Sequence, residues 1–96
     1  MASSKEYKDY ILEQLSLLDD IKCRPMMGEY LLYYREVLFG GIYDDRLLIK
    51  KVESNKKYKL SEKIPYDGAK TMYQIENTDD PIMLKNIIID TYNGLK

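Results

Sequence analysis

The sequence contains no histidine and a single cysteine, Cys23. Without histidine the chain has no Ser-His-Asp or Cys-His machinery, no imidazole general base and no imidazole metal ligand. A zinc site would have to be built almost entirely from carboxylates, although zinc prefers thiolate and imidazole ligands. We therefore expect no metal, no cofactor and no enzymatic activity. Cys23 has no activating base near it in the sequence, so we expect it to be a small core residue.

The sequence also lacks signals for export or membrane insertion. No apolar run approaches the ~20 residues that span a bilayer, and the N-terminus, MASSKEYKDY, becomes charged at once and is unlike a signal peptide. A lone cysteine cannot close an intrachain disulfide, which favours a reducing compartment. These absences predict a cytoplasmic protein without a membrane partner.

Neither sign of charge dominates. The 15 basic residues face 16 acidic ones, for a net charge of −1, which provides no general attraction to nucleic acid. The chain has 96 residues, of which 45% are hydrophobic and 32% charged. This length and composition predict one soluble globular domain spanning residues 1–96.

Periodic apolar residues predict a helix near each end of the chain. Ser3 and Glu6 fit the two positions of a capping box, and a helix is expected over residues 4–18. Asp80 and Pro81 fit the N-cap and first residue of a closing helix. The apolar residues that recur at helical spacing are Tyr7, Ile11, Leu15 and Leu18 in the first helix and Leu84, Ile87, Ile88, Tyr92 and Leu95 in the second.

Between these helices the pattern changes to short runs rich in Leu, Ile, Tyr and Phe, which predict strands. The expected strands are residues 29–34, 37–43, 46–51 and 70–76, with a further one at 21–27 that contains Pro25 and would lie at an edge. A short helix capped by Ser54 is expected over residues 54–62. The sequence therefore predicts an α+β fold, in which a mostly antiparallel sheet of about five strands has both terminal helices packed on one face.

The expected strands carry apolar side chains on both faces. Leu31 and Tyr33 point to one side of their strand, and Tyr30, Leu32 and Tyr34 to the other. Two helices cover one face, and a half-solvated sheet should be polar on its second face. Two interpretations remain open. In the first, the half-exposed ends of tyrosines and the strand pleats account for the apolar side chains on the second face. In the second, part of that face is an interface with a partner or a second copy.

Local features with simpler explanations include three acidic pairs and one glycine pair. Asp19-Asp20, Asp44-Asp45 and Asp79-Asp80 each lie at an expected turn or helix start, where turn and cap roles are far commoner than catalysis. Gly40-Gly41 lies inside an expected strand and is nothing like a phosphate loop. Close packing by a helix is the favoured explanation.

A lysine-rich segment from Lys50 to Lys63 is the one feature that suggests nucleic acid. Tyr58 lies within it and could stack on a base. Against this, the chain is slightly acidic, and its arginines are only Arg24, Arg35 and Arg46. A solvated surface segment is favoured, and direct nucleic-acid binding is the alternative. The residues of that alternative are Lys56, Lys57, Tyr58, Lys59 and Lys63.

The segment RPMMGEYLLYYREVLFGGIYDDRLLIK resembles the core pattern of the TfoX N-terminal domain family, and PYDGAKTMYQI resembles its second characteristic stretch. The matching residues are Arg24, Met26, Gly28, Tyr30, Tyr33, Phe39, Ile42, Asp45, Leu47, Lys50, Tyr66, Lys70, Met72 and Tyr73. The chain departs from the pattern at Met27, Glu29, Leu31 and Glu36, three of which stand in place of glycines.

The resemblance implies a small bacterial α+β domain with a secretion-chaperone-like sheet-and-helix arrangement. In the named regulators of the family, the domain promotes natural competence by assisting a cyclic-AMP-responsive transcription factor, and a second, C-terminal domain follows it. Here we expect a stand-alone domain. Transfer of the fold is stronger than transfer of the function, because one fold serves many functions.

Together these observations predict a non-enzymatic regulatory module that acts through protein–protein contacts. Its partner would be a protein such as a transcription factor, or a second copy in a homodimer. Aromatic anchors rimmed by charge suit such a surface, and we expect it at Arg24, Leu31, Tyr33, Lys50 and Lys51. A small-molecule site would need a pocket that the sequence does not announce.

Overall fold

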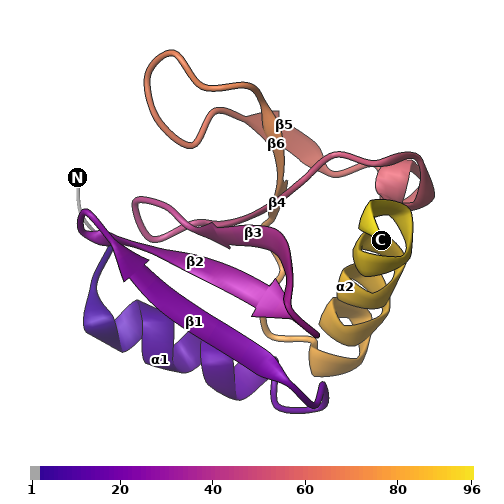
Figure 1. Cartoon of the computed structure of the whole chain (residues 1–96), viewed down its shortest axis with the longest axis horizontal. Coiled ribbons are helices and arrows are strands. Elements are labelled where there is room, and N and C mark those ends of the chain that lie inside the picture. The colour runs from indigo at the N-terminus through magenta and orange to yellow at the C-terminus, as the bar shows by residue number, and fades with distance from the viewer. Residues whose placement is uncertain (1–2) are drawn as a thin grey trace.

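The computed structural model describes residues 3–96 and confirms the α+β fold (Figure 1). Its elements in chain order are α1 (Lys5–Gln14), β1 (Ile21–Met26), β2 (Glu29–Tyr34), β3 (Val37–Ile42), β4 (Leu47–Ile49), the 3-10 helix η1 (Glu53–Tyr58), β5 (Ser61–Lys63), β6 (Met72–Ile75) and α2 (Pro81–Leu95). The strands form one sheet in the order β1-β2-β3-β4-β6-β5, and every pairing is antiparallel.

Both helices pack on the same face of the sheet, which we call the core face. Alternate residues of each strand point to it, so that Tyr30, Ile42 and Leu47 are neighbours across β2, β3 and β4. From α1 and the turn that follows it, Ile11, Leu15 and Leu18 contribute to the core, and from α2, Leu84, Ile87 and Ile88. This burial of an alternating face under two amphipathic helices is the arrangement that the periodicities predicted.

Tight hairpins connect β1 to β2, β2 to β3 and β3 to β4. Both central residues of each have positive φ, including Arg35 at 49° and Glu36 at 69°. Such turns match the twist of antiparallel strands but favour glycine or asparagine. Arg35 and Glu36 therefore hold a costly conformation. The Arg35 guanidinium lies over the Tyr34 ring at 5.1 Å and 3.5 Å from the Asp19 carboxylate, contacts that offset part of that cost.

The first helix is shorter than expected, and its cap is one residue later. Ser4, rather than Ser3, is the N-cap, and its hydroxyl accepts a hydrogen bond from the Tyr7 amide at 3.1 Å. The Ser3 hydroxyl instead donates to Glu29 and accepts from the Asp45 amide. The prediction of a Ser3 cap was wrong because these long-range hydrogen bonds hold Ser3 against the β1–β2 and β3–β4 hairpins.

The expected helix over 54–62 was also wrong, because that segment contains two elements. η1 begins after Val52, whose amide donates to the Asn55 side chain at 3.1 Å. Lys59 has a left-handed φ of 53° and ends η1. Residues 61–63 then pair with β6 as β5, which makes six strands instead of about five.

The glycine pair serves strand packing and not contact with a helix. A Cβ at Gly40 would overlap the Leu48 carbonyl oxygen and lie 2.8 Å from the Ile49 Cα, both in the neighbouring strand β4. At Gly41 it would lie 2.5 Å from the Tyr30 carbonyl oxygen and 2.9 Å from the Tyr43 ring. The register of β2 against β3 also shifts beside this pair, between Leu32 and Tyr33. The two glycines therefore allow the sheet to bend tightly at its centre.

Candidate functional site

The second face of the sheet, opposite the helices, is apolar but only partly exposed. Leu31 and Tyr33 of β2 and Leu38 of β3 are half-buried there, and Tyr33 and Leu38 are direct cross-strand neighbours. Leu48 of β4 is fully buried, and Tyr43, just after β3, is 7% exposed. The chain itself therefore covers the centre of this face, whereas the β2–β3 portion stays accessible to solvent. An interface on that accessible portion stays a prediction.

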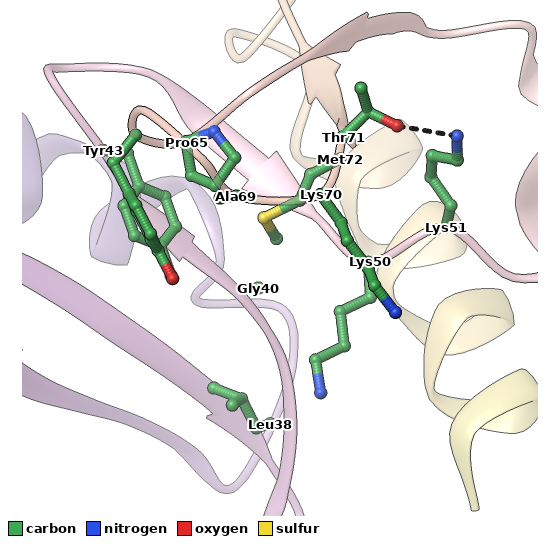
Figure 2. Close-up of a pocket in the computed structure, with 11 residues that line it drawn as sticks. Leu38, Gly40, Tyr43, Lys50, Lys51, Pro65, Ala69, Lys70, Thr71 and Met72 are labelled. Carbon is green, nitrogen blue, oxygen red and sulfur yellow. Dashed lines mark hydrogen bonds between the residues drawn. The ribbon is translucent and has the colours of Figure 1, made fainter.

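A pocket of about 760 Å³ opens where the second face meets the segment 64–71 that joins β5 to β6 (Figure 2). Leu38 and Met72 contribute apolar side chains from β3 and β6, and the buried Pro65 lies in the joining segment. The remaining lining residues are Gly40, Tyr43, Lys50, Lys51, Tyr66, Ala69, Lys70 and Thr71. The pocket therefore combines an apolar interior with several lysines, a composition typical of small-ligand sites.

The lysines of the pocket differ in their surroundings. The Lys51 ammonium donates to Glu62 at 2.7 Å and to Thr71 at 2.9 Å, and in Figure 2 it points away from Lys50 and Lys70. The hydrogen bond from Lys51 is the main cause that lowers the pKa of the Glu62 carboxyl. Within residues 3–96, Lys50 and Lys70 form no ion pair. Two cations without a counter-charge consequently remain at the pocket.

Two tyrosines form one wall of the pocket. The rings of Tyr43 and Tyr66 lie 6.4 Å apart at 50°. Tyr43 is buried, and its burial raises the pKa of its hydroxyl, with the neighbouring Tyr66, Glu29 and Tyr33 adding to the effect. Tyr66 by contrast is 61% exposed. The wall therefore presents one fixed ring and one ring that is still open to solvent.

A second, more polar hollow of about 500 Å³ lies on the other side of Pro65 and Tyr66. Glu29, Asp44 and Asp67 supply its acidic groups. The guanidinium of Arg46 also lines it and donates to the carbonyls of Ile64 and Pro65 at 3.2 and 3.4 Å. Arg46 thereby holds the start of the joining segment in place, and the segment separates a cationic pocket from an acidic one.

Of the residues predicted for an interaction surface, most lie together. Arg24 pairs with Leu31 across β1 and β2, Tyr33 follows on the same face, and Lys50 lies at the pocket. Lys51 differs, because its ammonium is bound to Glu62 and lies 5.8 Å from the Tyr73 ring, a core-face residue. Sequence reasoning missed Leu38, Tyr66, Lys70 and Met72 as site residues. Tyr66, Lys70 and Met72 belong to the second stretch that resembles the family, and this resemblance was the sequence signal that could have identified them.

The lysine segment of the nucleic-acid alternative does not form one open patch. Lys56 pairs with Glu53 at 2.8 Å, and Lys57 pairs with Asp90 of α2 at 3.0 Å. The Tyr58 hydroxyl donates to the same Asp90 carboxylate at 2.5 Å, and its ring packs against the core. Lys59, at the end of η1, and Lys63, in β5, are exposed. The segment therefore has fewer unpaired cations than the sequence indicates, and the Tyr58 ring is less available to stack on a base.

The remaining sequence candidates have structural roles. Cys23 lies on the core face opposite Leu32, where it is half-buried and packs against the core, and burial raises the pKa of its thiol. Asp44 and Asp45 form a hairpin turn, and Asp80 caps α2 by accepting from the Met83 amide at 3.1 Å. Across residues 3–96, no group of three or more potential metal-ligating side chains comes together. In the same range no helix is long and apolar enough to cross a membrane.

The six-stranded antiparallel sheet, its two terminal helices on one face and the pocketed second face define a small α+β domain with one helix-free side. The TfoX N-terminal domain family matches residues 13–85, which extend from the end of α1 into α2. The chain belongs to this family, as the resemblance in the two motif stretches implied. The matched range contains every residue that lines the pocket.

One relative among curated proteins is an uncharacterized 12.7 kDa protein in the trpE 5′ region of Spirochaeta aurantia. It is 31% identical over 72 residues, which cover 73% of this chain and 63% of that protein. The chain thus spans less than two thirds of this relative's length. Membership of the family suggests a regulatory role connected with competence.

Proposed function

We propose that this protein is a non-enzymatic regulatory module that acts in the cytoplasm by binding another protein, related in role to competence and transcription regulators. The observation that carries the proposal is the accessible part of the second sheet face. There Leu31, Tyr33 and Leu38 form an apolar strip that no helix within residues 3–96 covers, with Arg24 and Lys50 at its rim. Aromatic and aliphatic side chains surrounded by charge are the usual anchors of protein interfaces.

The choice of a protein partner over nucleic acid rests on the charges that are left unpaired. Of the lysines around Tyr58, Lys56 is engaged by Glu53 and Lys57 by Asp90, and the net charge of the chain is −1. A partner held through the second face would cover an apolar strip and meet only a few cations, so its binding should depend weakly on salt. Direct nucleic-acid binding would instead fall steeply as salt rises.

The test compares matched variants in affinity capture followed by mass spectrometry. Leu31→Asp places a charge in the apolar strip, and Tyr33→Ala removes its aromatic anchor. Leu17→Asp makes the same chemical change as Leu31→Asp at a side chain that is 50% exposed beyond the end of α1. We expect a protein that is retained by the wild type and by Leu17→Asp to be lost with both second-face variants.

Circular dichroism must first show that all variants are folded. Capture profiles that are the same for Leu31→Asp, Tyr33→Ala and Leu17→Asp would contradict the proposed surface. Light scattering of the purified chain tests the homodimer form of the proposal. A gel-shift titration at several salt concentrations tests the nucleic-acid alternative. A DNA shift that weakens steeply as salt rises would support that alternative.

A further inference from the structure

We propose that the pocket between the second sheet face and residues 64–71 binds a small organic anion with a flat aromatic body. This goes beyond the proposed function, because it assigns a small-ligand site to a pocket that shares only Leu38 and Lys50 with the proposed protein interface. The volume of about 760 Å³ lies within the ~300–1,000 Å³ of small-molecule sites. The pocket is an open hollow lined by β3, the end of β4 and the joining segment (Figure 2).

The ligand's charge follows from Lys50 and Lys70. Their side chains come from different segments, one directly after β4 and the other just before β6, and both line the pocket. No carboxylate pairs with either within the part of the chain that the structure describes, whereas Lys51 beside them is neutralised by Glu62. Two unpaired ammonium groups beside an apolar interior favour a ligand with one carboxylate, sulfonate or phosphate group.

The preference for a flat aromatic ligand follows from Tyr43 and Tyr66 and from the apolar side chains of Leu38 and Met72. Tyr43 is fixed by burial, with its ring against Gly41, where any Cβ would lie 2.9 Å from that ring. Tyr66 stands 6.4 Å from it and is still 61% exposed. A planar ring that lies against Tyr66, between the tyrosines and Met72, would remove this exposed aromatic surface from water. The adjacent acidic hollow beyond Pro65 would repel the same anion, which confines it to the lysine side.

The test uses 2-naphthoate as the probe and 2-naphthamide as its neutral match. In a titration followed by ¹⁵N–¹H NMR, naphthoate should shift the amides of Lys50, Ala69 and Thr71. Naphthamide should bind about 5- to 25-fold more weakly, because each of the two solvent-accessible ion pairs contributes up to about fivefold. A third arm with 2-naphthyl phosphate tells whether the lysines prefer a carboxylate or a phosphate. Tighter binding of either anion than of the amide supports the proposal.

Methionine variants test the two cations while keeping the apolar length of the side chain. Lys50→Met and Lys70→Met should each weaken naphthoate binding about fivefold. Lys85→Met, an exposed position on α2, is the matched control and should leave binding unchanged. Tyr66→Ala should weaken naphthoate and naphthamide alike.

Three results would overturn the proposal. These are equal affinity for the acid and the amide, equal affinity of Lys50→Met, Lys70→Met and Lys85→Met, or no shift at the pocket amides up to millimolar probe. The Leu31→Asp variant should bind naphthoate normally, because Leu31 does not line the pocket. Failure of this ligand site is therefore distinguishable from failure of the proposed protein interface.

Discussion

Asn55→Ala should destabilise the fold strongly, because Asn55 is a buried polar side chain that holds three segments together. Its exposure is 0%. The side-chain oxygen accepts from the Val52 amide at 3.1 Å, and the side-chain nitrogen donates to the Lys50 carbonyl at 2.8 Å and to the Thr91 hydroxyl at 3.0 Å. These bonds join η1 to the end of β4 and to α2.

The size of the effect follows from the groups that would lose a partner. In Asn55→Ala the Val52 amide and the Lys50 carbonyl are left without one, at about 1–2 kcal/mol each after partial access of water. The Thr91 hydroxyl still donates to the Ile87 carbonyl at 2.8 Å, so its loss is smaller. A total of about 2–4 kcal/mol is a large part of the roughly 5–15 kcal/mol that stabilises a small domain.

Urea unfolding followed by circular dichroism measures this change. With a slope of about 2 kcal/mol per molar urea, the midpoint should fall by roughly 1–2 M. Asn77→Ala, at an exposed position between β6 and α2, is the matched control and should shift the midpoint little. If Asn55→Ala changed the free energy of unfolding by less than about 1 kcal/mol, the buried network would not be as costly to break as the hydrogen-bond argument requires.

Three further predictions concern other parts of the fold. Gly40→Ala should lower the free energy of unfolding by about 3 kcal/mol or more, since the new methyl group meets the backbone of β4, and an unchanged melting temperature would contradict this. Asp80→Ala should cost about 1 kcal/mol by removing the cap of α2, while Asp80→Asn should retain most of that stability in the same denaturation assay. Burial, then the hydrogen bond to Asp90, raises the pKa of Tyr58 to about 12 from its ordinary 10.0. Because the pKa is higher in the folded state, the stability that it provides is fully present below pH 10 and is lost as the pH rises towards 12. Tyr58→Phe should therefore lose less stability in this alkaline range than the wild type. An absorbance titration in which no tyrosine ionises near pH 12 would refute this prediction.

Elements with strong local signals agree well between sequence and structure. The alternation in residues 29–34 and 70–76 predicted β2 and β6 and their faces, although β6 is shorter, Met72–Ile75, and Asp80-Pro81 marked the start of α2 correctly. The edge position of Pro25 in β1 also followed from its missing N–H. Each of these features depends on neighbours within a few residues, which is why the sequence alone was sufficient.

The errors arose where distant residues compete with local preference. Ser3 has the chemistry of a cap, but Glu29 and Asp45 bind it elsewhere. Residues 61–63 carry no strand signal of their own and become β5 only by pairing with β6. The Lys51 side chain lines the pocket, but its ammonium is bound to Glu62, a pairing that the sequence does not indicate. No local pattern encodes these pairings.

The types of the elements and the composition of the core follow from residue types and short-range periodicity, so they can be inferred without coordinates. The pairing of the cations, the close approach of β3 and β4 at Gly40 and the presence of Lys50 and Lys70 in one pocket follow from the folded arrangement alone. The physical reason is that a pocket and its unpaired charges are formed by side chains far apart in the chain, whose positions depend on how the whole sheet bends.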